Sequence, residues 1–405
     1  MKCRYCEQQL IHVFVDLGEM PPSNAYILPE NSDALEEKYP LKVFVCNNCW
    51  LVQTQDFIDA DKLFSADYAY FSSVSTGWLK HAKDYVTMIT QRLSLSTNSF
   101  VLEIASNDGY LLRNFVDAGI PCLGIEPTIA TSEAARALNI PVINDFFSVV
   151  SAKLLTKEYP KADLIIANNV LAHVPDIKDF IKALVLSLSR QGTITLEFPH
   201  LLQLIENNQF DTIYHEHFSY LSLSTVHHIC AALGLAVYDV EPLETHGGSL
   251  RLYLSHQQAD FKVTDAVLNM MNDEKEKGLQ CLHYYLAFQP RIEKIKQDVI
   301  AFLTEQKKRG KSVMGYGAAA KGNTLLNYAG ITTDLLPVIC DAAPSKQNRL
   351  MPGSHIPIKS PKYLEHRQPD YIFILPWNIK EEVTRQLSYL NNVKFLTVIP
   401  ELNVL

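Results

Sequence analysis

The stretch that decides the fold is Phe100-Val-Leu-Glu-Ile-Ala-Ser-Asn-Asp-Gly-Tyr-Leu-Leu-Arg-Asn-Phe-Val116. It opens with a short apolar run over residues 100–104, which predicts a buried strand. A polar turn over residues 105–109 follows, and the apolar residues after it recur at helical spacing. A strand, a tight turn and a helix in this order predict the first unit of an α/β domain with a parallel sheet.

The next predicted strand ends in a carboxylate. Residues 121–125 form the second apolar run, and Glu126 closes it about 20 residues after the turn. A carboxylate at this position can accept hydrogen bonds from the two hydroxyls of a ribose that lies across the strand ends. Dinucleotide-binding enzymes need several glycines in the preceding turn so that the backbone can approach a pyrophosphate, but this turn keeps only Gly109. A ligand without phosphates therefore fits better here.

A third strand is followed by polar side chains. Residues 163–167 are mostly apolar, and Asn168, Asn169 and His173 lie at or just beyond their end. Ligands of doubly wound sheets bind at the carboxyl ends of the parallel strands, so we expect these side chains near Glu126. A Rossmann-like domain that binds a different ligand is the alternative interpretation.

Two matched cysteine pairs lie in the first fifty residues. Cys3 and Cys6 form one CxxC pair, and Cys46 and Cys49 form the other. Four thiolates in this arrangement supply the closed tetrahedral set of a structural zinc site, which leaves no position open for a water or a substrate. The interval between the pairs is longer than in a typical zinc ribbon, which a small β-rich insert would explain. We therefore predict a structural zinc ion, with four reduced thiols and no metal as the alternative.

The composition excludes several classes of protein. The chain has 405 residues, of which 47% are hydrophobic and 20% charged, and this length predicts two or three domains. Its net charge of −8 argues against a nucleic-acid partner. The apolar stretches are too short to span a bilayer, and the first residues lack the pattern of a secretory signal. We expect a cytoplasmic protein with reduced cysteines, bound neither to nucleic acid nor to a membrane.

A dense group of titratable residues follows the central domain pattern. Tyr214, His215, Glu216 and His217 are consecutive, with apolar residues on both sides. A strand would place the two histidines on one face, whereas a turn would bring all four side chains to one pocket, and the sequence leaves both open. Because four such groups are costly to bury in a core, we interpret the stretch as catalytic. A metal site is the rival, although the His-Glu spacing of helical zinc enzymes is absent.

Three further stretches carry residues that could bind a ligand. The run Thr245-His-Gly-Gly-Ser-Leu-Arg251 can hold a sugar or a phosphate group, or simply form a turn that enters a strand. Tyr68 and Tyr70 share one face of an extended segment and either pack as a linker or reach a site. Residues 312–324 predict a strand, a glycine turn and a helix start, and Lys321 is followed by glycine, which excludes a Walker loop.

Taken together, these motifs resemble one family over the whole chain. The two cysteine pairs, DLGEMPPSNAYI (16–27), YAYFSS (68–73), ASNDGYLL (105–112), YHEHFSYLS (214–222), HGGSLR (246–251) and GYGAAAKG (315–322) occur in the order seen in the sugar C-methyltransferases of deoxysugar biosynthesis. The resemblance implies an enzyme that uses S-adenosylmethionine to methylate carbon 3 of a nucleotide-linked 4-keto-6-deoxyhexose, with no catalytic metal. One departure is Ala105, where such domains usually have glycine.

The resemblance also implies roles for individual residues. His217 would be the base that removes the proton beside the ketone, and an imidazole suits this work near neutral pH. The other residues around the sugar would be Tyr214, Glu216, Tyr70, Asn169 and His173, with Tyr68 as a neighbour. The cofactor would be held by Ala105, Asn107, Gly109, Glu126, Phe146 and Asn168. The substrate would also contact His246, Gly247, Gly248, Ser249, Arg251 and Lys321, the last at a helix amino end that suits a diphosphate.

The expected architecture is α/β throughout. An amino-terminal zinc-binding domain is expected over residues 1–72, and a class I Rossmann-like methyltransferase core with a substrate insertion over 73–258. A second Rossmann-like α/β domain over 259–405 would contact the nucleotide sugar. A monomer is the simplest expectation. The alternatives are methylation at oxygen or nitrogen, a sugar-nucleotide binding protein with a degenerate cofactor site, and a redox Rossmann enzyme.

Overall fold

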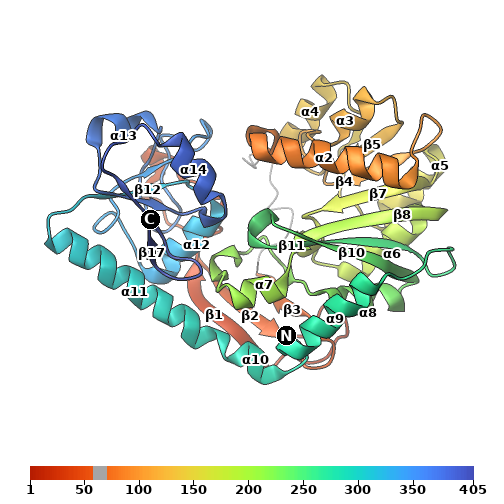
Figure 1. Ribbon diagram of the computed structural model, residues 1–405, viewed down its shortest axis with the longest axis horizontal. Coiled ribbons are helices and arrows are strands. Elements are labelled where there is room, and N and C mark those ends of the chain that lie inside the picture. The colour runs from red at the N-terminus through yellow and green to blue at the C-terminus, as the bar shows by residue number, and fades with distance from the viewer. Residues whose placement is uncertain (58–70) are drawn as a thin grey trace.

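The computed structural model describes residues 1–57 and 71–405, so the predictions for Tyr68 and Tyr70 lie outside the described residues. The described residues form three β-sheets, of four, seven and six strands. Figure 1 shows the central and the carboxyl-terminal units side by side, with the amino-terminal strands at their base. The predicted α/β class is confirmed, and the boundaries of the three domains remain predictions.

The central sheet has the strand order β10-β11-β8-β7-β4-β5-β6. Its members are β4 Val101–Ile104, β5 Cys122–Ile125, β6 Val142–Ile143, β7 Ala162–Asn168, β8 Leu188–Pro199, β10 Leu235–Leu243 and β11 Ser249–His256. The pairs among β4 to β8 are parallel, and β11 runs antiparallel to both of its neighbours. The chain crosses from β6 back past β4 to β7, so the switch point of this sheet lies between β4 and β7.

Helices pack around this sheet. They are α2 Thr76–Leu93, α3 Leu112–Asp117, α4 Ile129–Ala137, α5 Val149–Glu158, α6 Ile177–Ser187, α7 Leu201–Glu206, α8 Leu223–Ala232 and α9 Asp265–Lys277. All four residues of β4 are buried, as its apolar run predicts, and Glu103 is the one charged residue among them. The helix predicted after the glycine turn is α3, which begins two residues later than its first apolar side chain.

The amino-terminal sheet combines distant parts of the sequence. Its order is β1-β2-β3-β9, with β1 His12–Met20, β2 Tyr39–Val45, β3 Val52–Thr54 and β9 Ser219–Tyr220. β9 follows the titratable stretch directly and pairs antiparallel with β3. Residues 214–217 therefore form a turn, closed by the His217 amide on the Tyr214 carbonyl oxygen at 2.9 Å, and the strand begins only at Ser219.

The carboxyl-terminal unit is a second, mostly parallel sheet of order β14-β13-β12-β15-β16-β17. Its strands are β12 Val313–Tyr316, β13 Ile339–Cys340, β14 Ile358–Lys359, β15 Tyr371–Ile374, β16 Lys394–Thr397 and β17 Asn403–Val404. Its helices are α12 Ala320–Ala329, α13 Lys362–Arg367 and α14 Lys380–Gln386, preceded by α10 Leu282–Leu286 and the long α11 Phe288–Lys308. Pro290 lies in the first turn of α11, where its missing N–H needs no helical partner.

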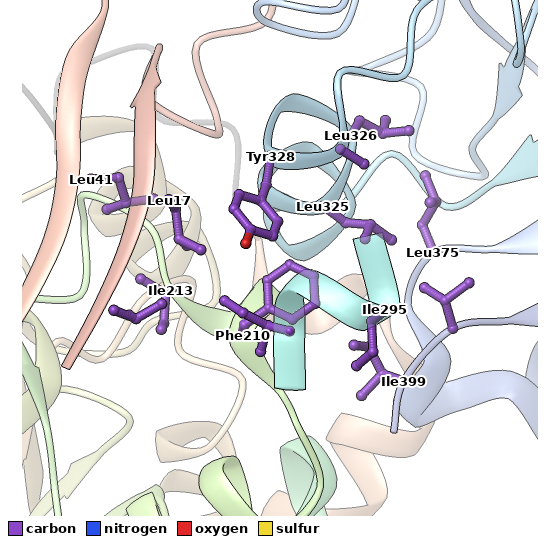
Figure 2. Packing of buried hydrophobic residues seen from close by; sticks show 14 of the residues in the cluster. Leu17, Leu41, Phe210, Ile213, Ile295, Leu325, Leu326, Tyr328, Leu375 and Ile399 are labelled. Carbon is purple, nitrogen blue, oxygen red and sulfur yellow. The ribbon is translucent and has the colours of Figure 1, made fainter. Parts of the chain in front are cut away.

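One hydrophobic core joins the amino-terminal sheet to the carboxyl-terminal unit. Figure 2 shows Ile213 next to Leu17 of β1 and Phe210 next to Tyr328 of α12, all in the same core. The rings of Phe210 and Tyr328 meet edge to face at 5.3 Å. The segment that leads into the titratable turn is therefore fixed on both sides. Within the described part of the chain, the helices are too short or too polar to cross a membrane.

Candidate active site

The described residues line a cleft of about 700 Å³ at the carboxyl ends of β4, β5 and β7. The amino-terminal region contributes Asn24, the titratable turn contributes His217, and the carboxyl-terminal unit contributes Lys321. The cleft therefore coincides with the switch point of the central sheet, where α/β folds bind ligands. Its volume lies in the range of sites for small molecules.

The turn after β4 shapes one half of this cleft. Ala105 and Asn107 both have left-handed backbone conformations, with φ of +54° and +50°. This explains why glycine is usual at the position of Ala105, because a side chain there costs about 1 kcal/mol. Gly109 lies behind the cleft, where an added Cβ would meet the Ile140 Cδ1 atom at 2.3 Å.

Glu126 closes β5 as predicted and is held rigidly. Its carboxylate accepts hydrogen bonds from the backbone amides of Asn107 and Thr128, each at 2.9 Å. Two side chains nearby present groups that suit a nucleoside with an amino-acid part. Phe146 lines the cleft with 40% of its surface exposed, and the Asn168 Oδ1 atom is buried without a hydrogen-bond partner among the described residues. These residues fit S-adenosylmethionine, because Glu126 could bind its ribose, Phe146 its adenine and Asn168 its amine.

The titratable turn and the end of β7 meet at the other half of the cleft. The His217 Nδ1 atom lies 2.8 Å from the Thr212 carbonyl oxygen, so it carries the proton and leaves the lone pair on Nε2. The ring of Tyr214 lies over His217 with centroids 4.0 Å apart, and His173 meets it edge on at 4.6 Å. Asn169, from the same strand end as His173, also lines the cleft.

The histidines of this cluster are neutral near pH 7. Burial and the neighbouring His173 hold the pKa of His217 well below its usual 6.5. Burial lowers the pKa of His173 to about 4, against the opposing effect of its hydrogen bond to the Glu216 carbonyl. A neutral imidazole can accept a proton, so the electrostatics of the cluster favour a base rather than an acid.

The stretch 245–251 separates into two groups. His246 lines the cleft with φ of +55° and packs on Trp78 at 5.2 Å, and burial lowers its pKa to about 3. Gly247 and Gly248 permit close packing, against Trp377 and Gln203. The other two side chains bond elsewhere in the fold. The Ser249 hydroxyl donates to the Thr245 carbonyl at 2.8 Å, and the Arg251 Nε atom donates to Glu197 at 2.7 Å.

Lys321 lies in the first turn of α12, at the cleft. Its ammonium donates to the Asn378 side-chain oxygen at 3.0 Å and lies 4.8 Å above the Trp377 ring. Burial lowers its pKa to about 8, against the opposing effect of Asp211. A cation at the amino end of a helix is suited to an anionic group such as a phosphate.

The four predicted zinc ligands come together at one point. Their sulfur atoms all lie within 4.8 Å of one another, with 3.6 Å between Cys3 and Cys49 and 3.4 Å between Cys6 and Cys46. Each CxxC pair closes in the same way. The residue after the second cysteine, Glu7 or Trp50, takes a left-handed conformation and donates its amide to the carbonyl of the first. The structure therefore brings the four cysteines of the predicted zinc site into one cluster that could hold the ion.

Sequence reasoning missed several residues that the structure brings to the cleft. Asn24 lies within the quoted stretch 16–27, whose recurrence in the family was the available signal. Trp78 opens the helix α2, and Asn378 follows the carboxyl end of β15, which is where a doubly wound unit binds ligands. Asp211 does not line the cleft but lies behind it, bonded to the Trp377 indole, and no motif in the sequence marks it.

Three family models match consecutive parts of the chain. They describe a zinc binding domain over residues 3–64, a methyltransferase domain over 78–240 and a C-methyltransferase C-terminal domain over 244–400. Among curated proteins, C-methyltransferase NovU from Streptomyces niveus is 31% identical over 406 aligned residues, which cover 100% of this chain and 96% of NovU.

Solved methyltransferases are similar to smaller parts of the chain. Magnesium protoporphyrin IX methyltransferase from Synechocystis PCC 6803 is 15% identical with a TM-score of 0.36, over 45% of this chain and 84% of its own. An S-adenosylmethionine-dependent methyltransferase from Clostridium acetobutylicum is 13% identical with a TM-score of 0.36, over 44% and 92%.

Proposed function

Because this chain belongs to the family of S-adenosylmethionine-dependent C-methyltransferases, we propose that it methylates carbon 3 of a nucleotide-linked 4-keto-6-deoxyhexose, in the biosynthesis of a branched deoxysugar. The observation that carries this proposal is the neutral imidazole of His217, buried in the same cleft as Glu126 and Lys321. Methylation at a carbon acid needs a group that is free to accept the proton, which a neutral imidazole is, whereas methylation at an amine does not.

In this proposal His217 takes the proton from carbon 3. The Thr212 carbonyl fixes the Nδ1 proton and the ring orientation, so Nε2 is the accepting atom. The carbon next to a ketone is a weak acid, and removing its proton leaves negative charge on the keto oxygen. Tyr214, whose ring contacts that of His217, is the phenol that would donate to this oxygen. Glu216, Asn169 and His173 would orient the sugar.

S-adenosylmethionine, when bound, supplies a methyl group on a positively charged sulfur. Its ribose would be held by Glu126, its adenine by Phe146 and its amino-acid part by Asn168, beside the turn that contains Ala105 and Asn107. The protein contributes mainly by positioning. Holding the sugar carbon and the methyl carbon in contact makes the reaction effectively unimolecular, which raises its rate.

The nucleotide part of the substrate would lie against the carboxyl-terminal unit. Lys321 at the amino end of α12 would bind the diphosphate, and Lys346 lines the same region. The eight cysteines, which form no disulfide, favour a cytoplasmic enzyme.

The test is mass spectrometry of the full chain incubated with S-adenosylmethionine and a panel of thymidine- and guanosine-linked 4-keto-6-deoxysugars. The proposal expects one added methyl that resists mild acid and base. A ¹³C-labelled methyl donor then locates the new carbon by its NMR couplings within the sugar. A methyl on oxygen or nitrogen would exclude the proposed reaction.

A further inference from the structure

Asp211 is a buried carboxylate that the proposed reaction does not use. It belongs to the short 3-10 helix η4 Phe210–Thr212 and is fully buried. Its Oδ2 atom accepts a hydrogen bond from the Trp377 indole at 2.7 Å. Its Oδ1 atom has no hydrogen-bond partner among the described residues. Burying a carboxylate with one unpaired oxygen is unfavourable unless a nearby cation offsets the charge.

The nearby cation is Lys321. Burial raises the pKa of Asp211 to about 6, and the charge of Lys321 opposes this rise. Conversely, burial lowers the pKa of Lys321 to about 8, and Asp211 opposes that fall. The Trp377 side chain joins the two groups, because its indole N–H bonds Asp211 while its ring lies beneath the Lys321 ammonium.

The other titratable groups that face Lys321 do not replace this negative charge. His217 on the titratable turn is buried and His246 on the 3-10 helix η5 Thr245–Gly247 is half-buried, and the charge of Lys321 contributes to lowering the pKa of each. Neutral imidazoles offer no counter-charge, and Lys346 in the same cleft is a second cation. Asp211 is the negative group that acts on Lys321.

We propose that Asp211 is a positioning residue that keeps the Lys321 ammonium charged and directed at the cleft, so that it can bind the diphosphate of the nucleotide sugar. The inference rests on the proposed function, since that function supplies the diphosphate. Both partners are charged between about pH 6 and pH 8. Above this window Lys321 loses its proton and the affinity for the anion falls.

The test variant is Asp211→Asn, because an amide oxygen can still accept the Trp377 hydrogen bond while the charge is lost. Without its counter-ion the half-buried Lys321 becomes neutral at lower pH. We expect the KM for the nucleotide sugar to rise about tenfold at pH 8.5 and much less at pH 6.5. The kcat value should change less than about twofold, because the Thr212 carbonyl that orients His217 is kept in place.

Lys321→Arg provides the rescue, because a guanidinium stays charged at every assay pH. In the double variant the KM at pH 8.5 should return toward the wild-type value. A fall of kcat and a rise of KM that are equal at all pH values, with no rescue by arginine, would show a merely structural role and overturn the proposal.

Calorimetric titration of the full chain with inorganic pyrophosphate and with thymidine diphosphate separates this inference from the proposed reaction, because it needs no turnover. Wild-type affinity should fall above pH 8, and Lys321→Arg should abolish this fall. If methyl transfer is absent but this pH dependence is present, the anion site stands and the proposed reaction fails. If Asp211→Asn does not fold, a pH-independent affinity of the wild-type chain still overturns the inference.

Discussion

The side-chain amide of Asn24 lies 2.8 and 2.9 Å from the two carboxylate oxygens of Glu216, across 192 positions of the sequence. The segment around Asn24 is tied to the carboxyl-terminal unit as well, because the Tyr26 hydroxyl donates to the Ala318 carbonyl at 2.6 Å. A loop of the amino-terminal region therefore runs between the titratable turn, residues 214–217, and α12. It holds Glu216 from one side while the hydrophobic core fixes the turn from the other.

Replacing Asn24 should reduce catalysis without affecting the cofactor. In Asn24→Ala the buried Glu216 loses a hydrogen bond to its charged form, which is worth about 1.5 to 3 kcal/mol and corresponds to at least a tenfold lower kcat. The affinity for S-adenosylmethionine, measured by calorimetry, should stay within about twofold. The exposed Asn31, on the same part of the chain, provides the control Asn31→Ala. Equal kinetics of the two variants would contradict the role of Asn24.

Removal of the base should separate binding from chemistry. We expect His217→Ala to lose methyl transfer and also the exchange of the sugar C–H proton in heavy water, followed by NMR. Binding of S-adenosylmethionine should persist, because His217 lies in the half of the cleft that we propose for the sugar, away from the residues proposed for the cofactor. Proton exchange at a near-normal rate in this variant would assign the base to another residue, and the exposed His283 serves for the control substitution.

The acid side of the pH profile should lie below the usual range of histidine. Burial favours the uncharged imidazole, so the pKa of His217 is lowered and the base form persists as the pH falls through 6.5. With saturating substrate, kcat should therefore stay constant from pH 7.5 to below pH 6.5 before it declines. An acid limb centred at or above pH 6.5 would show that the pKa of His217 is not lowered in the working enzyme.

Loss of a zinc ligand should act on folding. Cys46→Ser removes one of four converging sulfurs, and we expect lower zinc content by atomic absorption together with a lower yield of folded protein. The matched control is Cys281→Ser, because Cys281 is exposed and lies outside the cluster. A stable, active and zinc-free Cys46→Ser enzyme would refute a structural metal.

Gly247 should be far less replaceable than a glycine with similar backbone geometry and open surroundings. Its φ is +88°, and an added Cβ would lie 2.2 Å from the Trp377 Cη2 atom, whereas at Gly119, with φ of +68°, no atom lies within 4 Å. Gly119→Ala should cost only the backbone strain of about 1 kcal/mol. Gly247→Ala should lower the thermal midpoint further and raise the KM, because Trp377 must move away from Asp211.

A thermal midpoint of Gly247→Ala no lower than that of Gly119→Ala would mean that the Trp377 side chain can move aside with no loss of stability. Measured side by side by calorimetry, the two variants separate the contact from the backbone conformation, since both carry the strain of a positive φ.

Elements whose signals are local could be predicted from the sequence alone. The apolar run at residues 100–104 and the turn after it predicted β4 and α3, because burial and helical periodicity are written into neighbouring side chains. The CxxC spacing predicted the zinc site for the same reason, since each pair closes its own turn. The order of the motifs was enough to identify the family.

The convergence of residues that are distant in the sequence follows from the tertiary packing. The pattern of residues 214–217 allowed a strand or a turn, and the pairing of β9 with β3 selected the turn. The same packing brought Asn24 to Glu216 and Trp377 to Asp211, across 192 and 166 positions whose local patterns carry no record of the contact. Such contacts depend on which surfaces pack together when the three sheets assemble, and the periodicity of one segment carries no information about the segment it will contact.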